Sequence, residues 1–224
     1  MFRILIIRHG ETSWNKEKIF RGRVDVSLSD VGRQQAKLLA RRLSGQRIRS
    51  IYTSPLKRAY DTALAIQEGQ SGAADLSPII QDDLLIDINY GAWEKKGHLQ
   101  VQQEFPDLYQ QWLEAPHTVH IPDGESLSSI RQRVETFLDQ LIIQYEQYDQ
   151  RDTAATIALV SHRVIIKILL CAILGLDNSH FWQIKQDTAG LSVVECQGSR
   201  FVLSSLNDTC HLAEVSEQMS KDDF

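Results

Sequence analysis

The sequence predicts an α/β fold: a three-layer αβα sandwich with a mostly parallel central sheet and a C-terminal edge hairpin. Two short apolar runs, 4–7 and 154–160, are typical of strands that are buried on both faces. Segments with apolar residues at helical spacing separate these runs along the chain. Strands that alternate with helices favour a parallel sheet covered by helices on both sides.

The first half of the chain follows this alternation. After the first strand, Ser29 or Asp30 can cap a helix whose apolar positions recur at helical spacing, namely Ala36, Leu39, Ala40 and Leu43. Residues 50–53 predict a second strand, and a second helix begins near Leu56, just after Pro55. A short strand at 78–80, an aromatic-containing loop at 84–94 and a weak helix over 97–113, interrupted at Pro106, are predicted next.

The second half contains the clearest patterns. Residues 127–142 have the spacing of a long amphipathic helix, and an apolar helix over 164–174 follows the strand at 154–160. Two strand patterns, 191–196 and 200–205, flank Gln197-Gly198-Ser199 and predict a hairpin at the sheet edge. Because an unpaired edge can bind a second strand, this hairpin leaves a homodimer open.

Length and composition limit the classes of protein. With 224 residues and 42% hydrophobic residues, we expect one domain over 1–212 and a charged, flexible tail over 213–224. The net charge of −5 disfavours nucleic acid and anionic membranes as partners, so a bound anion must meet a local basic pocket. The apolar run at 4–7 is too short to span a membrane, and three widely spaced cysteines fit a reducing cytoplasm.

Polar clusters follow two of the predicted strands. Arg8-His9-Gly10 ends the first strand, and Ser161-His162-Arg163 ends the strand at 154–160. Arg58 lies one turn into the helix after another strand end. The carboxyl ends of strands are where open α/β sheets bind ligands, so we expect these side chains to meet.

These residue types suit phosphoryl chemistry. Arginine stays charged and can bind two oxygens at once, so Arg8 and Arg58 can hold a phosphoryl group for in-line attack. His9 can attack it if a backbone carbonyl holds its other ring nitrogen. His117 and His120 could contact a metal, but they lie in a proline-bounded loop without a third ligand, so we expect no metal site.

Several motifs resemble those of the histidine phosphatase superfamily, also called the phosphoglycerate mutase-like family. They occur in order over roughly residues 3 to 212, at 8–15, 22–29, 52–63, 90–94, 122–126, 160–162 and 207–212. The resemblance implies that His9 is transiently phosphorylated and that Arg8, Arg58 and His162 form the phosphate pocket. It places Asn15 and the Arg21-Gly22 turn near the substrate, and it implies neither a metal nor another cofactor.

The sequence departs from the family at informative positions. Asp87 stands where the family usually has a glutamate as proton donor, and Asp82, Asp83 and Glu11 are alternative acids. Arg163 replaces the usual glycine after the second histidine, and the usual glutamine before Gly22 is Arg21. Both changes add cations that suit a second carboxylate or phosphate on the substrate, although Arg163 could instead cap its helix or face solvent.

The leading hypothesis is a phosphohydrolase that cleaves a small-molecule phosphate ester through a phosphohistidine, without metal. A cofactor-dependent phosphoglycerate mutase is the alternative, and a phospho-ligand binding protein without turnover is a third hypothesis. Four aromatic residues could either form an apolar wall for the leaving group or pack in the core: Tyr90, Trp93, Phe105 and Trp112.

Overall fold

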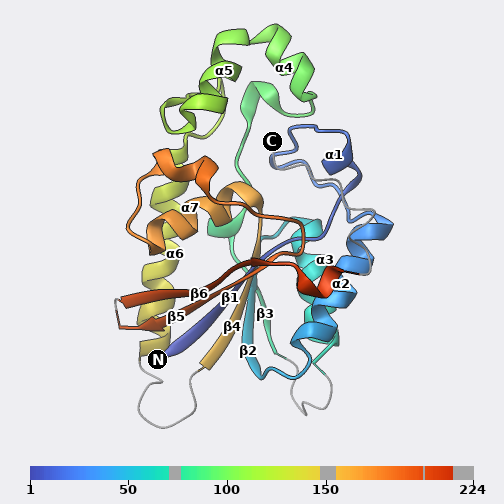
Figure 1. The fold of residues 1–224 in the computed structure, drawn as a ribbon, viewed down its shortest axis with the longest axis vertical. Coiled ribbons are helices and arrows are strands. Elements are labelled where there is room, and N and C mark those ends of the chain that lie inside the picture. Colours follow the sequence, from blue (N-terminus) through green and yellow to red (C-terminus); the bar gives the residue numbers. More distant parts are fainter. Residues whose placement is uncertain (71–76, 147–154, 199, 214–224) are drawn as a thin grey trace.

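The computed structural model describes residues 1–70, 77–146, 155–198 and 200–213 (Figure 1). Its six strands form one sheet in the order β3-β2-β4-β1-β5-β6. Their bounds are β1 (Phe2–Arg8), β2 (Ile48–Thr53), β3 (Ile79–Gln81), β4 (Ala155–Ser161), β5 (Leu191–Gln197) and β6 (Arg200–Asp208). The first four strands are parallel, whereas β5 runs antiparallel to both β1 and β6. The mostly parallel sheet and the edge hairpin are therefore confirmed.

Helices cover both faces of the sheet (Figure 1). The α-helices are α1 (Ser13–Lys16), α2 (Asp30–Leu43), α3 (Lys57–Glu68), α4 (His98–Glu104), α5 (Pro106–Glu114), α6 (Leu127–Glu146) and α7 (Arg163–Ile173). Short 3₁₀ turns are η1 (Asp83–Leu85), η2 (Gly91–Trp93), η3 (Pro116–Thr118), η4 (Asn178–Gln183) and η5 (Cys210–Leu212). The predicted break before Pro106 is confirmed, because Phe105 separates α4 from α5.

Strand β1 shows how the sheet divides two hydrophobic cores. Ile4 and Ile6 belong to the core that contains residues of α6 and α7, whereas Leu5 and Ile7 belong to the core under α2 and α3. All four side chains are almost fully buried. Burial of each such side chain contributes about 1.5–3 kcal/mol relative to leaving it exposed, so both faces hold β1 in place. The strand thereby presents its carboxyl end, with the polar residues that follow, at a fixed position.

Two helix starts on this frame matter for the site. Ser29 is the N-cap of α2, because its hydroxyl accepts a hydrogen bond of 3.0 Å from the Gly32 amide. Helix α3 begins at Lys57, directly after β2 and the Ser54-Pro55 turn, so Arg58 lies in its first turn. The sheet edge that carries the ends of β1, β2 and β4 therefore also receives Arg58.

The part of the chain that the structure describes contains no helix both long and apolar enough to cross a membrane. The predicted division into a domain over 1–212 and a flexible tail over 213–224 stays a prediction, because 214–224 lie outside the described residues.

Candidate active site

The carboxyl ends of three neighbouring strands meet at one point. Arg8 pairs with Ser161 across β1 and β4, and the His9 amide donates to the Ser161 carbonyl at 3.0 Å. The Ser54 amide donates to the Val160 carbonyl at 3.1 Å. The rings of His9 and His162 consequently lie close together, with 5.1 Å between their centroids. The structure thus brings together the two histidines that follow the predicted strands.

His9 is held as a neutral imidazole with one nitrogen uncommitted. Its Nδ1 lies 2.6 Å from the Gly10 carbonyl oxygen, which accepts only if Nδ1 carries the proton. Its Nε2 is buried and has no hydrogen-bond partner among the described residues. Burial, followed by the positive charge of Arg58, lowers the pKa of His9 well below its usual range. The Nε2 lone pair is therefore available near neutral pH.

Arg58 is fully buried and joins separate parts of the chain. Its guanidinium donates to the carbonyls of Gly22 at 2.8 Å and Val24 at 2.9 Å, and to Asp87 Oδ2 at 2.9 Å. Its Nε is buried without a partner among the described groups. Arg8 is likewise buried, and its Nη1 donates to the Gln186 carbonyl. The charges of both predicted phosphate-binding arginines, Arg8 and Arg58, act on His9.

His162 is held from the strand end after β2. Its Nε2 lies 2.8 Å from Ser54 Oγ, and its Nδ1 lies 3.5 Å from Asp87 Oδ2. Burial, and then the charge of Arg58, lowers the pKa of His162 well below its usual range. The imidazole is therefore neutral, so the long contact with Asp87 is not an ion pair. Ser54 was not predicted as a site residue, although it lies in a motif that the sequence analysis identified.

Asp87 is the candidate acid that the structure places at the site. Its Oδ1 accepts from the Ile88 amide at 2.9 Å, and its Oδ2 accepts from Arg58. The three alternative acids lie elsewhere. Asp82 caps η1, Asp83 is exposed, and Glu11 accepts from the N-cap hydroxyl of α2 at 2.8 Å.

The Arg21-Gly22 turn lies beside Arg58. Gly22 has a φ of +52°, and a Cβ at this position would lie 2.1 Å from Glu94 Oε1, so both the backbone and the space require glycine. Arg21 donates to Thr12 Oγ1 at 2.8 Å. Burial, together with the charges of Arg58 and Arg8, lowers the pKa of Arg21 to about 9. Asn15 accepts from the Thr12 amide at 2.8 Å, so its amide oxygen caps α1.

Arg163 is the first residue of α7. Its charge acts on Arg21, as do the charges of Arg8 and Arg58. Arg163 interacts with the Tyr90 hydroxyl, whose pKa burial raises to about 12. Burial and the charge of Arg163 also lower the pKa of His98 to about 4. His98 stacks on Phe20 with 4.3 Å between ring centroids, and Phe20 contacts Tyr90 edge-on at 4.9 Å. Arg163 therefore lies beside an aromatic cluster that includes His98, a residue without a predicted role.

Three of the aromatic residues with open roles belong to the buried core: Tyr90, Trp93 and Trp112. Trp93 and Trp112 are almost fully buried, and their rings meet edge-on at 6.0 Å. Phe105 is partly buried and packs against the same core cluster. Tyr90 differs from the other three because it has a hydroxyl, which interacts with Arg163 near the site.

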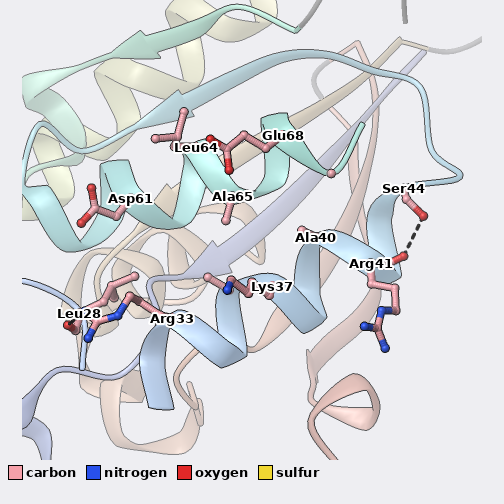
Figure 2. Close-up of a pocket in the computed structure, with 12 residues that line it drawn as sticks. Leu28, Arg33, Lys37, Ala40, Arg41, Ser44, Asp61, Leu64, Ala65 and Glu68 are labelled. Carbon is pink, nitrogen blue, oxygen red and sulfur yellow. Dashed lines mark hydrogen bonds between the residues drawn. The ribbon is translucent and has the colours of Figure 1, made fainter. Parts of the chain in front are cut away.

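A groove of about 540 Å³ between α2 and α3 is separate from this cluster (Figure 2). Lys37 and Arg41 come from α2, and Asp61 and Glu68 come from α3. None of the predicted site residues lines the groove. The residues predicted to carry the chemistry therefore lie at the strand ends and not in this groove. Among the described residues, no three metal-binding side chains of His, Cys, Asp or Glu gather at one place.

The buried histidines predict acid sensitivity of the fold. Some histidines have a lower pKa in the folded than in the unfolded state. Such a histidine contributes stability above pH 6.5, and this stability is lost as the pH falls from 6.5 to the pKa of the folded state. For His98 this window runs from 6.5 to about 4. As the pH falls below 6.5, we expect each such histidine to lower the free energy of unfolding by on the order of 1 kcal/mol per pH unit. The thermal midpoint should fall with it.

The measurement compares thermal midpoints from pH 7 to pH 4 in wild type and His98→Gln. The variant should show a flatter profile, and His120→Gln, which alters an exposed histidine, should match wild type. Identical slopes for His98→Gln and wild type would contradict the assignment to His98.

Comparisons with known proteins agree with this geometry. The sequence model described as "Histidine phosphatase superfamily (branch 1)" matches residues 4–209. The chain is 38% identical to "Phosphoserine phosphatase 1" of Hydrogenobacter thermophilus, over 99% of both chains. It is 30% identical to "Probable phosphoglycerate mutase GpmB" of Yersinia enterocolitica, over 95% of both. The solved structure of Bacillus stearothermophilus YhfR superposes with a TM-score of 0.85 at 29% identity, over 95% of this chain and 100% of that one.

Proposed function

Because the chain belongs to the histidine phosphatase superfamily, we propose that it is a phosphatase that hydrolyses small-molecule phosphate monoesters through a phosphohistidine at His9. The observation that carries this proposal is the buried, unpartnered Nε2 of a neutral His9. Its tautomer is fixed by the Gly10 carbonyl, and guanidinium groups lie around it. This is the arrangement that nucleophilic attack on an anionic ester requires.

In the first step, His9 Nε2 attacks phosphorus, forms the N–P bond, and the ester P–O bond breaks. Arg8, Arg58 and His162 bind the phosphoryl oxygens. A phosphoryl group bound by Arg58 lies beside Asp87, because Asp87 Oδ2 accepts from the same guanidinium. Asp87 then donates its proton to the leaving oxygen.

In the second step, water attacks the phosphohistidine. Asp87, now a carboxylate, accepts the proton of that water as the new P–O bond forms. The N–P bond breaks, inorganic phosphate leaves, and His9 returns to its neutral form. No step requires a metal, so we expect turnover to continue in EDTA.

We further propose that the substrate carries a second anionic group, with a carboxylate as the favoured candidate. The charges of Arg8, Arg58 and Arg163 all act on Arg21, and among the charges that act on it most strongly Asp87 supplies the negative one. The two negative charges of a phosphate dianion alone do not balance the positive charges of these four arginines. Gly22 accepts from Arg58, and Arg21 and Asn15 both form hydrogen bonds with Thr12. The relative named as a phosphoserine phosphatase supports a phosphorylated amino or hydroxy acid.

Arg163→Gly tests this recognition. We expect KM for phosphoserine to rise about tenfold or more, because a hydrogen bond to a charged group contributes roughly 1.5–3 kcal/mol. KM for an aryl phosphate without a carboxylate should change little. Arg163→Ala should behave in the same way, which separates the lost cation from any effect of glycine on α7. An equal rise in KM for both substrates would show that Arg163 does not recognise the carboxylate.

The mutase alternative returns the phosphoryl group to a second hydroxyl instead of to water, and one relative is named as a probable mutase. The assay supplies 3-phosphoglycerate with and without 2,3-bisphosphoglycerate, and an aryl phosphate with EDTA. Released phosphate supports the phosphatase, and interconversion without released phosphate overturns it. Binding without any turnover favours the third hypothesis, a phospho-ligand binding protein.

Location and assembly are part of the proposal. Cys171, Cys196 and Cys210 form no disulfide among the described residues, which suits a cytoplasmic protein. Strand β6 forms one edge of the sheet, and a homodimer through this edge is testable by measuring the mass in solution.

A further inference from the structure

The loop between η4 and β5 holds Arg8 at three points. The Arg8 amide donates to the Gly190 carbonyl at 3.3 Å, and the Ala189 amide donates to the Arg8 carbonyl at 3.0 Å. The Arg8 guanidinium donates to the Gln186 carbonyl. Both the backbone and the side chain of Arg8 therefore depend on where residues 186–190 lie.

Asn207 fastens this loop from the last strand. It has a φ of +51°, in the left-handed region that asparagine tolerates better than most residues. The pairing of β5 with β6 shifts register there, and such a bulge redirects a side chain. The Asp187 amide donates to Asn207 Oδ1 at 2.8 Å, and Asn207 Nδ2 donates to Asp187 Oδ2 at 2.9 Å. Two reciprocal bonds thus join β6 to the loop.

His211 fastens the same loop from η5. Its Nε2 lies 3.1 Å from the Ala189 carbonyl oxygen, and burial lowers the pKa of His211. The neutral ring therefore carries its proton on Nε2 and donates to Ala189. The packing is close: a Cβ at Gly190 would lie 2.3 Å from Asn207 Oδ1. Only glycine allows the loop to approach Asn207 this closely.

We infer that Asn207 and His211 form a C-terminal clamp whose function is to position Arg8 for phosphoryl binding. The hydrogen bonds of the Asn207 and His211 side chains described above end on loop residues 187 and 189, so the clamp acts through the loop. This inference rests on the proposed role of Arg8 in holding the phosphoryl group. A clamp that merely stabilised the sheet edge would affect unfolding without a specific effect on oxyanion affinity through Arg8.

A double-mutant cycle distinguishes the two roles, with orthovanadate as the probe and calorimetry as the measurement. Asn207→Ala should weaken vanadate binding about tenfold in the wild-type background, within the range of coupling between connected residues. In the Arg8→Met background the same change should cost less than about twofold, because the group that the clamp positions is gone. The same loss in both backgrounds, or none in either, overturns the inference.

A rescue experiment adds a second readout. Asn207→Asp keeps the acceptor for the Asp187 amide, but it places a second carboxylate against the carboxylate of Asp187. The variant should therefore weaken vanadate binding. Adding Asp187→Asn restores a donor and should recover most of the affinity; failure to recover it would count against the clamp. Asn207→Asp also replaces Asn207→Ala in the cycle if the alanine variant does not fold.

Two controls keep the outcomes separate. Asp208 lies on the same strand as Asn207 and pairs with Arg42 of α2. Asp208→Asn removes this ion pair and should leave vanadate affinity unchanged. If Arg8→Met alone leaves vanadate affinity unchanged, the proposed function of Arg8 fails, whatever the clamp does. If Arg8→Met weakens binding and Asn207→Ala does not, the clamp alone fails.

Discussion

Replacing His9 with alanine is expected to lower kcat for an aryl phosphate by about 10⁴-fold or more, because no other group can form the covalent intermediate. The neighbouring His162 is not expected to substitute for it, because its Nε2 bonds to Ser54 and its unpartnered Nδ1 is the nitrogen proposed to bind the phosphoryl group. Steady-state assays of purified His9→Ala and wild type give the measurement. The phosphoenzyme should be detectable in wild type by intact mass after rapid mixing, and should be missing in His9→Ala.

The control for this experiment is His120→Ala, which alters an exposed histidine far from β1 and should retain full activity. Orthovanadate should still raise the thermal midpoint of His9→Ala, because Arg8 and Arg58 remain. A His9→Ala enzyme that retains a tenth of the wild-type kcat would rule out the phosphohistidine mechanism.

The sequence predicts well which side chains come together at the strand ends, because their positions depend on the strands themselves. Arg8, His9 and His162 directly follow or end apolar runs that are unmistakable, and parallel strands bring their carboxyl ends together. Ser29 as the N-cap of α2 and the break before Pro106 follow in the same way from local chemistry. Where the position of a side chain depends on its own secondary structure, the sequence is sufficient to predict that position.

The remaining parts of the site depend on distant loops. The Gln186 carbonyl binds Arg8, yet a backbone acceptor leaves no signal in side-chain type. Ser54 meets His162 across 108 positions of sequence, and His98 reaches the site only because α4 folds back to Phe20. The resemblance favours Asp87 over the three alternative acids, but the side-chain chemistry alone does not separate them. Only the structure shows that Asp87 contacts Arg58.

Asp87→Asn is expected to act selectively on substrates with poor leaving groups. Loss of a general acid should reduce kcat for phosphoserine by about 10²- to 10⁴-fold, whereas an aryl phosphate, whose leaving oxygen needs little protonation, should lose about tenfold or less. Asparagine retains an oxygen for the Arg58 guanidinium and leaves the shape of the site unchanged. The ratio of the two kcat values therefore reports proton donation and not misfolding.

Asp82→Asn and Glu11→Gln are the matched controls. Asp82 caps the turn η1, and Glu11 accepts from the Ser29 hydroxyl, so each variant neutralises an alternative acid. If Asp87→Asn slows both substrates equally, Asp87 holds Arg58 in place and another group is the acid. Asp87→Glu restores the longer side chain that the family usually carries, with the same acid function. Retention of the leaving-group ratio in Asp87→Glu, together with its collapse in Asp87→Asn, would assign the proton to this carboxyl and not to its contact with Arg58.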